Sequence, residues 1–276
     1  MNDCASLLRV AALQASLAWE NPEANCTAFS KELDSLQEPN DLIVLPEMWA
    51  TGFTMNPRTH ACLLPLGWQD DEDRWPTPLK AMRKWACERD AAVIGSLACQ
   101  DKTLAHPVNR CFFVPPTGSV ECYDKRHLFT FAGEDAAYGP GAERVIVKWR
   151  GWRILLQVCY DLRFPVFSRN RAADRYDAAV YVANWPAARR QAWSNLLIAR
   201  AIENQCYVAG VNRVGRDGMG IEHSGCSALI DPYGRTQAEL YLDASGWMVG
   251  SWDRAELERY REKFPVLGDA DIFSLE

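Results

Sequence analysis

The chain has 276 residues, of which 48% are hydrophobic and 24% are charged, and its formal net charge is −6. This composition is that of an ordinary folded protein and argues against disorder. The absence of any strong basic run argues against nucleic acid as a partner. No apolar run approaches the roughly 20 residues that cross a bilayer, so no membrane span is expected.

The start of the chain and its cysteines bear on its location. Residues 1–6 show no positive segment followed by an apolar block, so we expect no signal peptide and a cytoplasmic protein. The ten cysteines are scattered without a C-x-x-C pair, which predicts reduced thiols rather than disulfides. The four histidines form no H-x-x-x-H pattern, so no metal site is expected.

The first half of the chain predicts strands that alternate with helices. Residues 7–14 have the apolar character of a buried strand, and Asn21 is the predicted N-cap of a helix that begins at Pro22 and runs to about residue 36. The further predicted elements are a strand (42–45), a long loop over a pocket (48–75), a helix (77–89), a strand (91–97), and a hairpin (110–114 with 119–123).

The second half predicts hairpins, helices and single strands. In chain order they are a hairpin (145–148 with 152–158), a helix (167–173), a strand (178–183), a helix (193–204), a strand (206–211), a flexible loop (215–220), a hairpin (227–230 with 236–240), a strand (247–252) and a helix (255–263). Such a mixture predicts an α/β fold with a mixed sheet, or two sheets, covered by helices. No repeat or linker is present, so we expect one domain over residues 1–276, with the tail 264–276 packed on a partner subunit.

A cysteine at the end of an apolar run is the first candidate for chemistry. Cys159 directly follows the predicted strand 152–158. The thiolate is the reactive form of cysteine, and a strand-to-helix turn is expected to favour it through the positive end of the helix dipole. The ordinary alternative is a buried core thiol.

Two carboxylates and an ammonium also follow apolar runs. Glu47 comes directly after residues 42–46, where partial burial raises the pKa of a carboxyl group and suits it to general-base work. Lys125 follows a hairpin strand, where its charge is suited to stabilising an oxyanion. Glu134 is placed to orient Lys125 and keep it charged. The ordinary alternatives are solvated loop glutamates and a surface lysine.

Three segments in this order resemble the nitrilase (carbon–nitrogen hydrolase) superfamily. They are Leu45-Pro-Glu47-Met, Tyr123-Asp-Lys125-Arg-His-Leu-Phe, and Val158-Cys159-Tyr-Asp-Leu-Arg163-Phe-Pro. Similar segments lie at 183–186, 200–204, 212–215 and 260–265, so the resemblance covers nearly the whole chain. It is strongest to the bacterial ω-amidase-like branch, which hydrolyses the side-chain amide of 2-oxo acids such as 2-oxoglutaramate or 2-oxosuccinamate.

The resemblance implies a fold and a mechanism. The fold is a four-layer α-β-β-α sandwich with two mixed sheets, and the protein is a homodimer or a higher homo-oligomer. The implied catalytic residues are Glu47, Lys125 and Cys159, with Glu134 as the second glutamate. The backbone N–H of Tyr160 joins Lys125 in holding the oxyanion of the step that leads to a thioester. No metal or organic cofactor is required.

Substrate recognition is expected from residues near the thiol. Arg163 is suited to bidentate pairing with a substrate carboxylate, and the alternative is an internal salt bridge, for example with Asp161. Trp185 and Phe53 are candidates for the pocket wall, with ordinary core packing as the alternative. The resemblance adds Asn184 as a substrate-binding residue.

Other functions remain open at this point. An N-carbamoyl amino-acid amidohydrolase shares the same triad, and a catalytically silent ligand-binding protein is the alternative from a different class. A true nitrilase fits less well because such enzymes usually carry longer C-terminal extensions. A papain-like protease needs a histidine partner for Cys159, and only His127 and His223 are candidates. A packing or hydrogen-bonding role suits His127 better.

Overall fold

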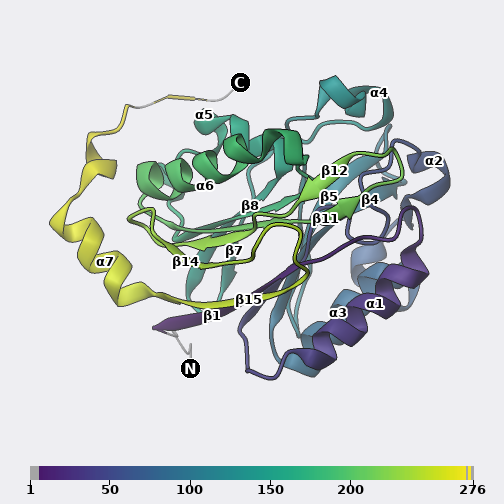
Figure 1. Cartoon of the computed structure of the whole chain (residues 1–276), viewed down its shortest axis with the longest axis horizontal. Helices are drawn as coiled ribbons and strands as arrows, with labels where there is room; N and C mark the ends of the chain where they lie inside the picture. The colour runs from purple at the N-terminus through teal and green to yellow at the C-terminus, as the bar shows by residue number, and fades with distance from the viewer. Residues whose placement is uncertain (1–5, 272, 275–276) are drawn as a thin grey trace.

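Two large β-sheets lie face to face between two layers of helices in the computed structural model of the chain (Figure 1). The structure describes residues 6–271, 273 and 274. The described residues leave out 1–5, which include Cys4. They also leave out 272, 275 and 276 of the predicted tail 264–276. Among the residues that the structure describes, no helix is long and apolar enough to cross a membrane.

The first sheet combines parallel and antiparallel strands in the order β15-β1-β2-β4-β5-β6. The central strands β1, β2 and β4 run parallel, β15, β5 and β6 join antiparallel, and β3 pairs with β4. The strands are β1 (Leu7–Gln14), β2 (Leu42–Val44), β3 (Cys62–Leu64), β4 (Ala92–Asp101), β5 (Val108–Val114), β6 (Glu121–Asp124) and β15 (Gly246–Asp253).

The second sheet has the order β14-β13-β10-β9-β8-β7 and is parallel only in its centre. Its strands are β7 (Ile146–Trp149), β8 (Trp152–Val158), β9 (Ala178–Ala183), β10 (Tyr207–Asn212), β13 (Ala228–Ile230) and β14 (Thr236–Glu239). A separate pair is formed by β11 (Val214–Arg216) and β12 (Glu222–Ser224). These two mixed sheets confirm the predicted α/β fold class.

Helices cover the outer face of each sheet (Figure 1). The first sheet is covered by α1 (Pro22–Ser35) and α3 (Thr77–Arg89), and the second by α5 (Pro165–Ser168) and α6 (Arg190–Asn204). Asn21 is the N-cap of α1 as predicted, because its side chain accepts a hydrogen bond of 3.0 Å from the backbone N–H of Ala24. The remaining helices are α2 (Pro57–His60), α4 (Glu134–Ala137) and α7 (Arg254–Lys263).

Apolar side chains from both sheets fill the space between them. Val10 and Ala12 of β1 belong to the same buried cluster as Ile154 of β8 and Val180 of β9, and all four are fully buried. Burial of this kind is the main favourable contribution to folding, at about 25 cal/mol for each Å² of apolar surface. The packed sheets give fixed positions to the loops that follow their strands.

The predicted helix 167–173 is wrong. The structure has the four-residue α5 (Pro165–Ser168), and a short 3₁₀ turn follows at Ala172–Asp174. The side chain of Asn170 explains the break, because it accepts a hydrogen bond of 3.0 Å from the backbone N–H of Tyr176 and donates one of 2.9 Å to its carbonyl. These bonds replace helical ones, which is how asparagine commonly ends helices.

Two predicted loops contain more structure than expected. Residues 48–75 include α2, the short strand β3 and two 3₁₀ turns, so this segment is partly regular. The predicted flexible loop 215–220 lies within the small hairpin of β11 and β12. Strands of three residues carry too few apolar positions to show a periodicity in the sequence.

Candidate active site

The three residues singled out in the sequence meet at one end of the two sheets. Glu47 follows β2, Lys125 follows β6 and Cys159 follows β8. Their exposed fractions are 0%, 1% and 8%, respectively, so the solvated-loop and surface alternatives for Glu47 and Lys125 are wrong. Glu134, at the start of α4, is also fully buried.

Lys125 is held between two carboxylates. Its Nζ lies 3.0 Å from Oε1 of Glu47, and 3.0 and 2.9 Å from the two carboxylate oxygens of Glu134. Asn109 of β5 joins the cluster, because its Nδ2 donates to Oε1 of Glu47 at 2.7 Å and to Oε1 of Glu134 at 3.3 Å. The four side chains therefore form one buried hydrogen-bonded network.

Backbone donors fix both carboxylates in place. The N–H of Asn184 donates to Oε2 of Glu47 at 2.7 Å, and the Asn184 side chain donates to the Glu47 carbonyl at 2.6 Å. The N–H of Phe129 donates to Oε2 of Glu134 at 2.6 Å. Hydrogen bonds of this kind orient a carboxylate and limit its motion.

The charges in the network keep Lys125 protonated. Burial lowers the pKa of Lys125, but the negative charges of Glu134 and Glu47 outweigh burial and raise that pKa above its usual value. Burial raises the pKa of Glu134, and Lys125 opposes this effect only in part. The network thus provides a permanent ammonium beside Glu47.

The backbone of Cys159 is in an uncommon conformation. Its φ angle is +45°, in the left-handed region that non-glycine residues rarely adopt, and it begins the 3₁₀ segment Cys159–Arg163. Asp161 holds this turn, because its Oδ2 accepts hydrogen bonds from the N–H of Val158 at 2.9 Å and from the hydroxyl of Tyr123 at 2.8 Å. Strained residues of this kind occur often at functional sites.

The prediction that a helix dipole lowers the pKa of Cys159 is wrong. Burial raises the pKa of the thiol well above its usual value, and the charge of Glu47 and a hydrogen bond to Glu47 raise it further, while Lys125 opposes them. The five-residue 3₁₀ turn that begins at Cys159 has no extended helix dipole. The resting sulfur is therefore a protonated thiol that needs a base to react, and Glu47 is next to it.

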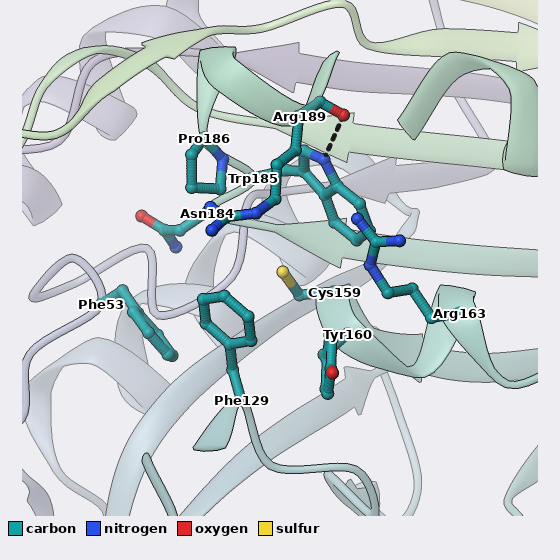
Figure 2. Close-up of a pocket in the computed structure, with 9 residues that line it drawn as sticks. All are labelled: Phe53, Phe129, Cys159, Tyr160, Arg163, Asn184, Trp185, Pro186 and Arg189. Atoms are coloured by element: carbon teal, nitrogen blue, oxygen red, sulfur yellow. Dashed lines mark hydrogen bonds between the residues drawn. The ribbon is translucent and has the colours of Figure 1, made fainter. Parts of the chain in front are cut away.

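The sulfur of Cys159 faces a narrow pocket (Figure 2). The empty space in this pocket, open solvent included, is about 310 Å³. The lining residues are Phe53, Phe129, Cys159, Tyr160, Arg163, Asn184, Trp185, Pro186 and Arg189. The five predicted wall and substrate-contact residues, Phe53, Tyr160, Arg163, Asn184 and Trp185, are thus all at this pocket.

Arg163 does not form the predicted alternative ion pair with Asp161. One oxygen of Asp161 accepts from Val158 and Tyr123, and the other lies 2.8 Å from Nδ1 of His127. The guanidinium carbon of Arg163 lies 4.9 Å from the ring centre of Trp185. Among the residues that the structure describes, Arg163 has no ion-pair partner.

Histidine does not partner Cys159, which contradicts the papain-like alternative. His127 bonds to Asp161 and stacks on Phe164 with 3.9 Å between ring centres, as expected for a packing and hydrogen-bonding residue. Nε2 of His223 lies 3.1 Å from Asp217. Neither histidine lines the pocket. Within the described part of the chain, no group of acidic, cysteine or histidine side chains is arranged to hold a metal ion.

Two polar residues of the site were not identified from the sequence. Asn109 is a polar residue inside the apolar strand β5, and that position was a usable signal. Arg189 follows β9 by six residues and lines the pocket, but its neighbour Arg190 looks the same in the sequence. No local pattern distinguishes the two arginines.

A buried thiol that lines the pocket, a carboxylate beside it and an ammonium bonded to that carboxylate are the groups that nucleophilic hydrolysis requires. On a sandwich of two mixed sheets, they are typical of hydrolases that carry a cysteine nucleophile at the end of a strand. The carbon–nitrogen hydrolase family model matches residues 9–262, and the chain belongs to this family.

Known relatives match over nearly the full length. The chain is 46% identical to the ω-amidase YafV of Yersinia enterocolitica, over 98% of this chain and 99% of the relative. It is 30% identical to a 2-oxoglutaramate amidase of Bacillus subtilis, over 94% of this chain and 96% of the relative. A solved carbon–nitrogen hydrolase superfamily protein of Xanthomonas campestris, XC1258, has a TM-score of 0.90 and 39% identity, and the match covers 98% of this chain and 99% of that one. The predicted fold and family are confirmed.

Proposed function

We propose that the protein hydrolyses the ω-amide of a 2-oxo acid, such as 2-oxoglutaramate or 2-oxosuccinamate, to the acid and ammonia. The full-length similarity to ω-amidases carries this proposal. The pocket supports it, because the arginine Arg163 beside the thiol has no ion-pair partner among the described residues and suits a carboxylate-bearing substrate. A homodimer and a cytoplasmic location are further parts of the proposal.

The first half of the reaction forms a thioester. Glu47 takes the proton from the thiol of Cys159 as the sulfur attacks the amide carbon. The carbonyl oxygen becomes an oxyanion, which Lys125 and the backbone N–H of Tyr160 stabilise. The C–N bond then breaks as Glu47 gives its proton to the nitrogen, and ammonia leaves.

The second half releases the acid. Glu47, again ionised, takes a proton from a water molecule as the oxygen of that water attacks the thioester carbon. The C–S bond breaks, and the sulfur takes the proton back from Glu47. One amide and one water give one acid and one ammonia, and the enzyme returns to its starting state. Glu134 has a positioning role, because both of its carboxylate oxygens bond to the ammonium of Lys125.

Ammonia release from a panel of substrates tests the proposal. The panel contains 2-oxoglutaramate, 2-oxosuccinamate, glutamine, an N-carbamoyl amino acid and a nitrile. We expect the highest kcat/KM on one of the two 2-oxo amides. A preference for the carbamoyl amino acid would favour the amidohydrolase alternative, and no release from any substrate would favour a silent ligand-binding protein.

Replacement of Arg163 with methionine tests its proposed contact with the substrate carboxylate. Loss of a hydrogen-bonded charge pair costs about 1.5–3 kcal/mol. We therefore expect the KM for carboxylate-bearing amides to rise by about 10- to 100-fold in the Arg163→Met protein. The KM for neutral amides should change little.

The exposed Arg216 offers a matched control, because it pairs with Glu222 on the small hairpin and does not line the pocket. The Arg216→Met protein should have the KM of the unmodified enzyme for both kinds of amide. Equal loss on charged and neutral amides in Arg163→Met would instead indicate that Arg163 has a structural role.

A further inference from the structure

The pocket is lined by a second arginine that forms no ion pair among the described residues. Arg189 lies at the end of the short turn after β9 and is half-buried. Its guanidinium carbon lies 5.5 Å from the ring centre of Phe129 and 4.9 Å from that of Phe131. Within residues 6–271, 273 and 274, no carboxylate forms an ion pair with it, and its side chain makes no hydrogen bond.

The packing of Arg189 leaves its donors available. A guanidinium that packs against aromatic rings keeps its N–H groups free for a planar acceptor such as a carboxylate. The backbone on either side is fixed, because the Arg189 N–H donates to the Pro186 carbonyl at 2.9 Å and the Arg189 carbonyl accepts from the Trp185 indole at 2.9 Å. The second of these bonds is drawn in Figure 2.

Arg163 shows the same arrangement on another wall of the pocket. It packs on Trp185 at 4.9 Å, and Figure 2 shows the two guanidinium groups on either side of the Cys159 sulfur. Trp185 links the two arginines, because its ring contacts Arg163 and its indole N–H is bonded to Arg189. Two guanidinium groups whose N–H donors are available thus line the same small pocket.

An anionic substrate needs these two cations, because the buried network of Lys125, Glu47 and Glu134 does not attract it. Behind the sulfur, two carboxyl groups share one ammonium, so the network has no surplus positive charge. The chain as a whole has a net charge of −6. A carboxylate that enters the pocket therefore depends on cations in the pocket lining. Arg163 and Arg189 are the only cationic side chains among the pocket-lining residues that the structure describes.

We propose that Arg189 determines specificity together with Arg163, by binding the carboxylate and 2-oxo end of the substrate while the amide carbon lies at Cys159. This inference rests on the proposed function and deepens it. A carboxylate with an adjacent ketone offers three oxygen acceptors in one plane, which is more than one guanidinium fork satisfies. The second guanidinium explains a preference for 2-oxo acids over simple carboxylic acids.

The test compares 2-oxoglutaramate with its neutral methyl ester. We expect kcat/KM for the acid to fall by about 10- to 100-fold in Arg189→Met, since a hydrogen-bonded charge pair is lost. The kcat/KM for the methyl ester, which keeps the ketone but carries no charge, should fall clearly less than that for the acid. Arg189→Lys keeps the charge but not the planar fork, so an intermediate loss is expected.

Arg190 provides the matched control, because it is the next residue along the chain, is exposed and does not line the pocket. Arg190→Met should hydrolyse both amides at the rate of the unmodified enzyme. An equal loss on acid and ester in Arg189→Met, or no loss on either, would overturn the proposal. The thermal unfolding midpoint of each variant shows whether a loss reflects misfolding.

Binding of 2-oxoglutarate, the product anion, separates this inference from the proposed function. We expect calorimetry to show at least about tenfold weaker binding to Arg189→Met than to Arg190→Met, and a smaller loss in Arg189→Lys. If the unmodified enzyme hydrolyses no 2-oxo amide, the proposed function fails, but the binding comparison still decides the role of Arg189. Unchanged binding in both Arg189 variants would refute that role.

Discussion

Replacement of Cys159 with alanine is expected to abolish amide hydrolysis and to leave the fold intact. The sulfur is the only thiol among the pocket-lining residues that the structure describes, and removal of an enzymatic nucleophile typically costs at least about 10⁴-fold in kcat. The change removes one buried sulfur atom and adds no bulk, so the free energy of unfolding should change by about 1 kcal/mol or less. Ammonia release and chemical unfolding measure the two effects.

Cys87 is the matched control for this experiment. It is an exposed thiol on α3 and does not line the pocket. The Cys87→Ala protein should keep full activity. Mass spectrometry after rapid quenching should detect an acyl adduct on the unmodified enzyme and none on Cys159→Ala. Turnover by Cys159→Ala close to that of the unmodified protein would exclude a thioester at this position.

The sequence identified the central residues because each follows an apolar run. Lys125 and Cys159 come directly after strands and Glu47 follows β2 by three residues, and the end of a strand is where a side chain can leave the core and face a cleft. Their order along the chain carried the resemblance to the family. The distances that unite them depend on the packing of one sheet on the other, and no local pattern contains that information.

Features that arise from tertiary contacts were missed for the same reason. Asn109 bonds to carboxylates 62 and 25 residues away, and Asn170 ends a predicted helix by bonding to Tyr176 and to Asn204 of α6. The sequence alone does not distinguish Arg189 from Arg190, and only the structure shows which of them lines the pocket. The prediction that Cys159 favours the thiolate was wrong, because burial raises the pKa of the thiol by more than any dipole at the turn lowers it. The sequence alone gives no measure of that burial.

Replacement of Lys125 with methionine is expected to have the largest effect on stability. It leaves Glu47 and Glu134 buried and facing each other without the cation that both now contact at about 3 Å. Removal of one partner from a buried ion pair typically costs about 3–5 kcal/mol, because the remaining charge is uncompensated. Activity should be lost as well, since the oxyanion loses a stabilising cation. Urea unfolding at pH 7.5 measures the change in stability.

Lys84 is the matched control, because it is an exposed lysine on α3 that pairs with Glu88 at 3.4 Å. Surface pairs of this kind contribute little, so Lys84→Met should change the free energy of unfolding by less than about 1 kcal/mol. A loss in Lys125→Met no larger than that in Lys84→Met would mean that the two carboxyl groups do not depend on the ammonium.

The pH dependence of this variant identifies the cause of its instability. Burial already raises the pKa of Glu134, and Lys125 is the main group that opposes the increase, so its removal raises that pKa further. A carboxyl group whose pKa is higher in the folded than in the unfolded state binds more protons when folded, and stability then rises as the pH falls. Lys125→Met should therefore regain stability as the pH is lowered from 8 towards the unfolded-state value of about 4.3. A deficit that stays constant over this range would point to lost packing around the lysine stem, because packing does not titrate.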